Sequence, residues 1–164
     1  MDKKTRFNQI FDGHYDKVFR ICKGYYNGNE ALAADTTQDI FIKIWESLDA
    51  FKDESSISTW IYRISVNTCL MYLRKVSTKR EQSTAEFPTI IAEPYSKDYE
   101  EKLKKMYACI QTLDEKDRMI MLMILEGIEY ADISAVIGLS EDSLRVRIHR
   151  IKKNLKQCVQ DGNI

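Results

Sequence analysis

The stretch Leu139–Lys156, LSEDSLRVRIHRIKKNLK, predicts a helix with one packing face and one free face. Ser140 can accept hydrogen bonds from free backbone N–H groups at the helix start, and Glu141 and Asp142 suit the positive end of the helix dipole. Apolar residues recur at the helical period along one side: Leu144, Ile148, Ile151 and Leu155. The opposite side is therefore free to bind another molecule.

A shorter helical pattern precedes this stretch. Residues Tyr130–Ile137 repeat apolar side chains at helical spacing, and Gly138 can adopt the left-handed conformation that ends a helix. Leu139 can then fill the angle between the two helices. This order of helix, tight turn and helix predicts a helix-turn-helix unit.

The free side of the second helix carries only positive charge after its first turn. Its basic residues are Arg145, Arg147, Arg150, Lys152, Lys153 and Lys156, with no acidic residue among them. Such a face suits a polyanion, although a basic helix face is often only a solvated surface. The helix and turn before it favour the nucleic-acid interpretation, because together they make a DNA-binding motif.

The combined stretch YADISAVIGLSEDSLRVRIHRIKKNL, residues 130–155, resembles the C-terminal promoter-reading domain of bacterial sigma factors. The resemblance is to the extracytoplasmic function (ECF) class of the sigma-70 family. It implies that this domain contacts the −35 element of duplex promoter DNA. The residues it assigns to that contact are Ser143, Arg145, Val146, Arg147, His149, Arg150 and Lys153.

The composition limits the class of protein without identifying a partner. The 164 residues carry zero net charge, so a nucleic-acid role depends on where the charges lie. The N-terminus lacks the apolar core of a signal peptide and no run could span a membrane, which predicts a cytoplasmic protein. The cysteines stand far apart, so we expect isolated, mostly buried thiols and neither a disulfide framework nor a metal site; they are Cys22, Cys69, Cys109 and Cys158.

Two amphipathic helices are expected near the N-terminus, over Thr5–Tyr26 and, after a cap at Asn29, over Glu30–Leu48. The second should bury Ala33, Thr37, Ile40, Phe41, Ile44 and Leu48. Its other side is an acidic stripe with a large apolar residue inside it, formed by Asp35, Gln38, Asp39, Ile42 and Glu46. Acidic helix faces are usually only solvated, but a polar rim around an apolar centre is typical of a protein-binding patch.

The sigma-factor resemblance extends to this stripe. DTTQDIFIKIW, residues 35–45, resembles the segment with which ECF sigma factors bind the clamp helices of the largest subunit of core RNA polymerase. The resemblance implies that the acidic stripe faces the polymerase, while Phe41 and Trp45 mainly hold the domain's own core. It also implies contact with the flap of the second-largest subunit and control by an anti-sigma factor, with no cofactor and no small-molecule substrate.

Residues 49–58 lack helical periodicity and predict a loop that ends at a helix cap near Ser58. A third helix should follow, and its inward set should be Trp60, Ile61, Ile64, Thr68 and Met71. Another side carries a polar stripe of Arg63, Asn67 and Arg74, which could be plain surface. The pattern by itself does not decide between surface and binding site.

FKDESSISTWIYRISVN, residues 51–67, resembles the sigma-factor region that melts the −10 element and holds an unpaired base. The resemblance assigns this role to Phe51, Lys52, Ser55, Ser56, Trp60, Arg63, Asn67 and Arg74. These residue types fit the task, because a flipped base needs a stacking surface, small polar groups for its edge and positive charge for its backbone.

The helical pattern ends between Ser77 and Ser96, where both prolines of the chain, Pro88 and Pro94, mark a linker. After it we expect a helix over Lys97–Thr112 and another capped by Asp114, whose apolar run MIMLMIL should be central to the C-terminal domain. The sequence thus predicts an all-α fold of two small helical domains joined by a flexible linker. The expected boundaries are 1–79 (sigma region 2), 80–96 (linker) and 97–164 (sigma region 4, with the helix-turn-helix).

The function implied is that of an alternative sigma factor, which binds core polymerase, recognises −35 and −10 elements and promotes DNA opening. A stand-alone helix-turn-helix repressor or activator is the alternative, but it leaves the polar stripes of the second and third helices unexplained. An enzyme is disfavoured, because the sequence presents no nucleophile with a base, no Gly-rich phosphate loop and no carboxylate–His cluster.

Overall fold

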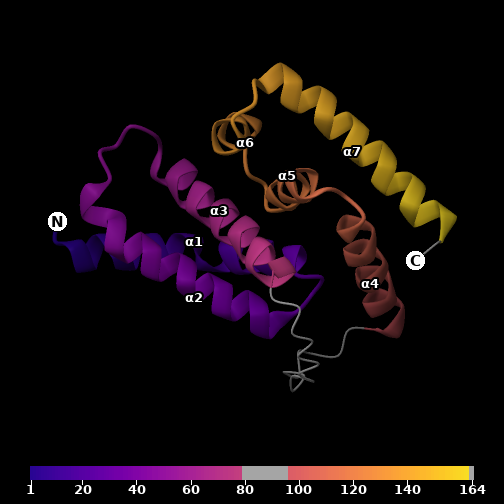
Figure 1. Ribbon diagram of the computed structural model, residues 1–164, viewed down its shortest axis with the longest axis horizontal. Coiled ribbons are helices and arrows are strands. Elements are labelled where there is room, and N and C mark those ends of the chain that lie inside the picture. Colours follow the sequence, from indigo (N-terminus) through magenta and orange to yellow (C-terminus); the bar gives the residue numbers. More distant parts are fainter. Residues whose placement is uncertain (79–95, 163–164) are drawn as a thin grey trace.

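The computed structural model describes residues 1–78 and 96–162, and in the first range it describes side chains as far as Tyr72. These residues form seven α-helices and one short 3-10 helix, with no strand among them. The N-terminal elements are α1 (Lys3–Tyr25), α2 (Glu30–Ser47), η1 (Leu48–Ala50) and α3 (Ile57–Thr78). The C-terminal elements are α4 (Lys97–Gln111), α5 (Glu115–Leu125), α6 (Tyr130–Ile137) and α7 (Glu141–Asp161). The all-α prediction is confirmed (Figure 1).

Side-chain caps set the starts of several helices, among them α2, α5 and α7. Asn29, Asp114 and Ser140 each accept a hydrogen bond from the backbone N–H three residues on, which satisfies a donor that the helix itself leaves free. Gly138 ends α6 in the left-handed conformation with φ 78°, and Ser140 then starts α7. The helix-turn-helix therefore forms as its sequence predicts.

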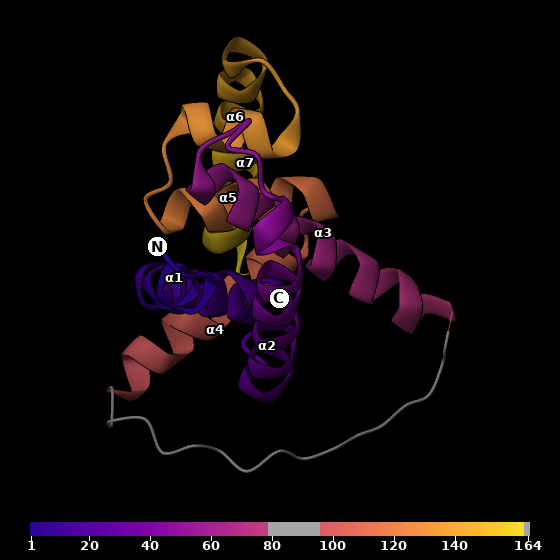
Figure 2. The same ribbon diagram turned by 90° about the vertical axis from the view of Figure 1, so that its left-hand side faces the viewer.

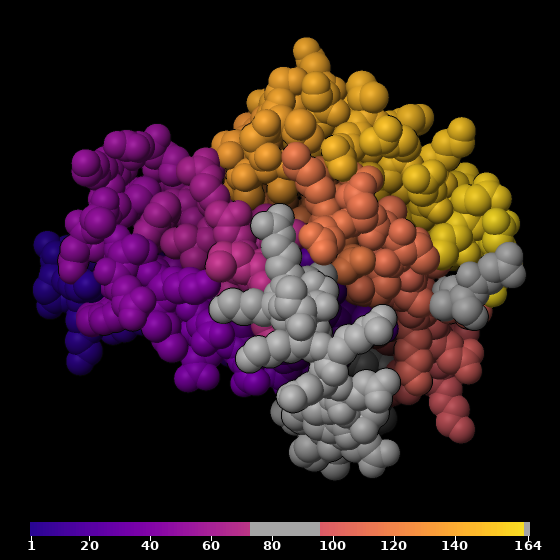
Figure 3. Space-filling view, viewed as in Figure 1, coloured from indigo at the N-terminus to yellow at the C-terminus, as the bar shows by residue number. Residues whose placement is uncertain are grey.

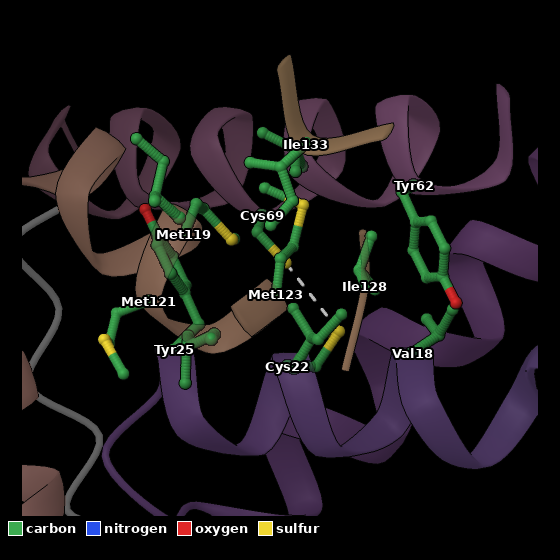
Figure 4. Packing of buried hydrophobic residues seen from close by; sticks show 14 of the residues in the cluster. Val18, Cys22, Tyr25, Tyr62, Cys69, Met119, Met121, Met123, Ile128 and Ile133 are labelled. Atoms are coloured by element: carbon green, nitrogen blue, oxygen red, sulfur yellow. Dashed lines mark hydrogen bonds between the residues drawn. The ribbon is translucent and has the colours of Figure 1, made fainter. Parts of the chain in front are cut away.

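The N-terminal and C-terminal helices share one hydrophobic core. Buried residues of α1, α2, α3, α5, α6 and α7 belong to a single cluster, and Figure 4 shows side chains of α1, α3 and α5 meeting within it. Figure 2 places α3 beside α6, and Figure 3 shows the two halves adjoining along the front of the molecule. The Met-rich helix α5 buries Met119, Met121 and Met123. It is a core helix, as predicted, and it packs partly against α1 of the N-terminal half.

The two halves approach each other closely at Gly24 of α1. A β-carbon built on Gly24 would lie 2.3 Å from Cδ2 of Leu122 on α5, so only glycine fits without a shift of the neighbouring side chain or helix. Close by, the side-chain amide of Gln111 donates to the backbone carbonyls of Gly24 and Tyr25 at 3.0 and 3.1 Å. The end of α1 is thus held against both α4 and α5.

Several details differ from the sequence-based expectation. α3 begins one residue before the expected cap, because the Ser56 hydroxyl, rather than Ser58, accepts from the N–H of Thr59. Met71, expected inside, is exposed, whereas Tyr62, Ser65 and Val66 are buried. The reason is that α3 packs on α2 with one side and on α6 with another. The buried side of α2 is as predicted.

The prediction of isolated thiols is wrong. Cys109 and Cys158 form a disulfide that joins α4 to α7, with their α-carbons 5.9 Å apart although 49 residues separate them in sequence. Cys22 and Cys69 are both buried, and their sulfur atoms lie 3.7 Å apart between α1 and α3. Helix packing brings distant turns together, and sequence spacing does not reveal this.

The predicted linker, including Pro88 and Pro94, lies outside the described residues. Within the parts of the chain that the structure describes, none of the helices is long and apolar enough to cross a membrane.

Candidate functional site

The outward face of α7 presents most of the residues predicted to contact duplex DNA. Its buried residues Leu144, Ile148 and Ile151 fix the helix to the core. The opposite side is exposed and consists of Ser143, Arg145, Val146, His149, Arg150 and Lys153. Val146 is 73% exposed, so its side chain is free to meet an apolar group of a partner.

Arg145 lies at the start of this face, in a position defined by two neighbours. Its guanidinium lies over the ring of Tyr130, 5.3 Å from the ring centre, and 3.8 Å from the carboxylate of Glu141. Both contacts are on the surface, so they orient the side chain at small energetic cost and leave its donors available.

Arg147 is different from the other basic residues of α7. It is turned inward with a side chain 24% exposed, its Nε donates to Asp117, and its Nη2 lies 3.6 Å from Asp114. Both acids belong to the start of α5, and Asp114 is also the cap of that helix. Arg147 therefore links α7 to α5 in this conformation, instead of projecting toward a ligand.

The acidic stripe of α2 is exposed along its whole length: Asp35, Gln38, Asp39, Ile42 and Glu46. Ile42 is 47% exposed in the middle of these polar groups. The stripe borders a surface groove of about 510 Å³ between α1 and α2. Acidic groups thus rim an apolar depression, an arrangement suited to a partner that offers both apolar and basic side chains.

The floor of this groove is aromatic. Phe7 and Phe11 of α1 face Trp45 and Phe41 of α2, with ring centres 5.2 Å apart for Phe7–Trp45 and 5.0 Å for Phe11–Phe41. Phe41 is buried as predicted, but Trp45 is 40% exposed and belongs as much to the surface as to the core. Phe7, Phe11 and Tyr15 lie in the amphipathic helix predicted over Thr5–Tyr26, but they are not among the predicted site residues. Their partial exposure follows from their place at the open edge of the α1–α2 pair.

In the loop predicted to hold an unpaired base, an aromatic side chain packs against the start of α3. The rings of Phe51 and Trp60 lie 4.8 Å apart, and the guanidinium of Arg6 lies 5.6 Å from the centre of the Phe51 ring. Lys52 is exposed, Ser55 is partly exposed, and Ser56 caps α3. This region offers a stacking surface with a cation and small hydroxyl groups beside it.

The polar stripe of α3 meets the C-terminal half. Nη2 of Arg63 donates to the carbonyl oxygen of Ala135 on α6 at 3.0 Å, and the Thr59 hydroxyl donates to Asp132 at 3.4 Å. Asn67 is exposed and lines a groove of about 570 Å³ that Val136 and Arg147 also line. The side chain of Arg74 lies outside the described residues. The candidate −10 face and the helix-turn-helix are therefore in direct contact.

Comparison with known proteins assigns the two halves to one family. The family model described as sigma-70 region 2 matches residues 10–79, and the model described as sigma-70 region 4 matches residues 103–155. The ECF RNA polymerase sigma-E factor of Escherichia coli (strain K12) is 30% identical, and the alignment covers 97% of this chain and 88% of that protein. The chain belongs to the ECF sigma factor family. The corresponding factor of Haemophilus influenzae is 29% identical over 97% of this chain and 89% of its own.

Two solved structures share the fold. One is RpoE in complex with the anti-sigma factor NepR from Bartonella quintana, with a TM-score of 0.73, 21% identity, and coverage of 94% of this chain and 97% of that one. The other is CnrH in complex with the cytosolic domain of CnrY, with a TM-score of 0.72, 20% identity, and coverage of 98% and 91%. The likeness spans both helical halves of the present sigma factor.

A salt bridge joins the two halves of the sigma factor. Arg20 of α1 binds the carboxylate of Glu126, at the end of α5, through Nε and Nη2 at 2.9 Å. The hydrogen bonds with Glu126 raise the pKa of the Arg20 guanidinium above its ordinary value. Arg118 of α5 adds a cation–π contact, 5.3 Å from the ring centre of Tyr25. Polar contacts thus surround the buried apolar contact between α1 and α5.

Proposed function

We propose that this alternative sigma factor binds core RNA polymerase through the acidic stripe of α2 and the aromatic groove beside it. The clamp helices of the largest subunit are the expected partner there, and the flap of the second-largest subunit is the expected partner of the C-terminal half. The observation that carries this assignment is Ile42, a large apolar side chain exposed within an acidic rim and next to an apolar groove. Apolar burial supplies affinity at such a site, and the charges supply orientation and selectivity.

The promoter is read by two surfaces in this proposal. The exposed face of α7 binds the duplex −35 element, and the loop from Phe51 to Ser56 with the stripe of α3 binds the unpaired −10 strand. The corresponding domains are residues 1–79 and 97–164, with 80–96 as the connection. The chain acts as a non-catalytic subunit in the cytoplasm, where core polymerase works, and an anti-sigma factor restrains it.

The contact between α3 and α6 adds a conformational requirement. Arg63 already donates to a backbone carbonyl of α6, and Asn67 faces a groove whose other wall is the C-terminal half. Both side chains are exposed, but a DNA strand that binds Arg63 must replace its hydrogen bond to α6, and one that binds Asn67 must enter the groove beside the C-terminal half. We therefore place the described conformation before DNA binding and expect the two halves to separate when the holoenzyme forms.

Run-off transcription with purified core polymerase tests this function. We expect promoter-dependent transcripts from the wild-type factor, and a larger loss for Phe51→Ala and Asn67→Ala on a closed promoter than on a template mismatched over the −10 element. The reason is that a preformed bubble supplies the unpairing energy that the base pocket otherwise provides.

Core binding should survive both substitutions, since neither residue lies on the acidic stripe. Equal effects on closed and pre-melted templates would contradict the −10 assignment. Tight duplex binding without polymerase, together with an absence of transcripts, would instead support a free-standing repressor.

A further inference from the structure

The disulfide between Cys109 and Cys158 connects the last turns of two C-terminal helices. Cys109 lies near the end of α4 and is buried, whereas Cys158 lies near the end of α7 and is partly exposed. The bond joins α4, which binds α1 through Gln111, to α7, whose other end carries the proposed DNA-binding face. It is the only covalent link between helices in the described residues.

We propose that Cys109 and Cys158 form a reversible redox site whose disulfide stabilises the DNA-reading half of the sigma factor. Cytoplasmic thiols are normally kept reduced, so the bond would form when small disulfides such as glutathione disulfide accumulate. This inference rests on the proposed separation of the two halves, since it concerns the state in which the C-terminal helices have left the N-terminal ones.

The chemistry follows from the exposure of the two thiols. The Cys158 thiolate, at the more accessible end, attacks one sulfur of glutathione disulfide and releases one glutathione thiolate. The Cys109 thiolate then attacks the Cys158 sulfur of the mixed disulfide and releases the second. One glutathione disulfide is reduced to two glutathione molecules, which take up the two protons that the cysteines lose. Excess glutathione reverses both steps.

The C-terminal half needs such support because much of its core is shared. Leu122, Met123 and Ile133 are buried in the cluster that also contains residues of α1 and α3. When the halves separate, these side chains lose part of their cover, and a bundle of four short helices has little core of its own. A cross-link across 49 residues offsets this loss by restricting the unfolded chain.

The second cysteine pair provides an internal contrast. Cys22 and Cys69 are both buried in the shared core, and their mutual hydrogen bond lowers the pKa of the Cys22 thiol and raises the pKa of the Cys69 thiol. Because neither sulfur atom reaches the surface, glutathione disulfide has no access to either thiol in the folded protein. The pair should therefore stay reduced under conditions that oxidise Cys109 and Cys158.

A redox titration of the full-length protein tests the site. Samples are equilibrated at fixed ratios of glutathione to glutathione disulfide, the free thiols are alkylated, and peptides are identified by mass spectrometry. We expect a peptide that links Cys109 to Cys158, with Cys22 and Cys69 alkylated after unfolding. Absence of the linked peptide at every ratio overturns the proposal.

Thermal unfolding measures the stabilisation. The oxidised wild type should melt on the order of 10 °C above the reduced protein. Cys158→Ser, at the partly exposed position, should melt like the reduced wild type in both buffers. If the melting temperature of Cys158→Ser differs between oxidising and reducing buffer by as much as that of the wild type, the effect comes from other cysteines and the proposal is overturned.

Run-off transcription links the site to function. The ratio of wild-type to Cys158→Ser transcripts should rise as the buffer becomes more oxidising, and the ratio corrects for effects of redox on the polymerase itself. A constant ratio contradicts a role for the bond in promoter use. If neither protein yields transcripts at any ratio, the proposed function fails, whereas the melting and peptide results still decide whether the disulfide forms and stabilises the chain.

Discussion

The guanidinium of Arg63 on α3 donates a hydrogen bond to the carbonyl oxygen of Ala135, 3.0 Å away at the end of α6. A carbonyl at a helix C-terminus carries partial negative charge, so it satisfies a cation in place of a phosphate. The described conformation thus pairs Arg63, which is predicted to contact single-stranded DNA, with the helix-turn-helix half.

The tight contact at Gly24 predicts an asymmetry between two glycines of the same helix. Gly13→Ala should stabilise the protein by about 0.5–1 kcal/mol, because alanine favours the helix and a β-carbon meets nothing within 4 Å. Gly24→Ala should lower the melting temperature, because its β-carbon meets Leu122. Thermal unfolding of both variants checks this, and equal stabilisation by the two substitutions would show that α1 and α5 do not pack as described.

The Arg20–Glu126 bridge predicts a charge-swap rescue. Glu126→Arg should loosen the two halves by placing two cations together, with a loss of about 0.5–1 kcal/mol since Arg20 is half exposed. Small-angle scattering should report a larger radius of gyration, and the double variant Arg20→Glu with Glu126→Arg should restore the wild-type value. Failure of the double variant to restore it would argue against this pairing.

The acidic stripe predicts a local effect on polymerase binding. Asp39→Arg should slow association with core polymerase several-fold and leave folding unchanged, because Asp39 is exposed. Glu101→Arg is the matched control, since Glu101 is equally acidic and exposed but lies on α4. Binding kinetics at two salt concentrations check the result, and the same loss for both variants would indicate a general charge effect.

The exposed face of α7 predicts a sequence-specific loss. Arg145→Ala should cost about 1–3 kcal/mol in binding to the −35 duplex if Arg145 contacts a base. Lys156→Ala, at another exposed basic position of the helix, should weaken binding less and without dependence on sequence. Holoenzyme affinity for matched and mismatched −35 sequences separates the two cases, and a uniform loss for Arg145→Ala would make it a phosphate contact.

Arg147 should behave as a stabilising residue. Arg147→Ala leaves the buried carboxylate of Asp117 without its cation, so it should reduce the free energy of unfolding by roughly 1–3 kcal/mol. Arg150→Ala, at an exposed position of the same helix, should change stability by less than about 0.5 kcal/mol. Denaturant unfolding measures both. An unchanged stability for Arg147→Ala would contradict the stabilising role and favour the original prediction that Arg147 contacts DNA.

Helix positions, caps and exposed faces could be predicted from the sequence because they depend on neighbours within one or two turns. Asn29, Asp114 and Ser140 each cap the helix that starts beside them, and the exposure of Asp39 and Arg145 follows from the helical period. The three stretches that resemble sigma-factor segments placed these faces in a sigma factor, and the family comparisons confirm that membership. The residues that line each site stay predictions.

Only the tertiary structure decided which helix each face meets. Periodicity gives the angle of a side chain about its own helix axis, but not the neighbour on that side. From the sequence, Arg147 is indistinguishable from its exposed neighbours, but in the structure α5 places Asp117 against it. Cys109 is likewise isolated in the sequence, but the packing of α7 against α4 places Cys158 next to it. The contact of α3 with α6 arises in the same way, from residues more than 70 positions apart. Such contacts depend on how whole helices pack, and the local sequence pattern does not determine this packing.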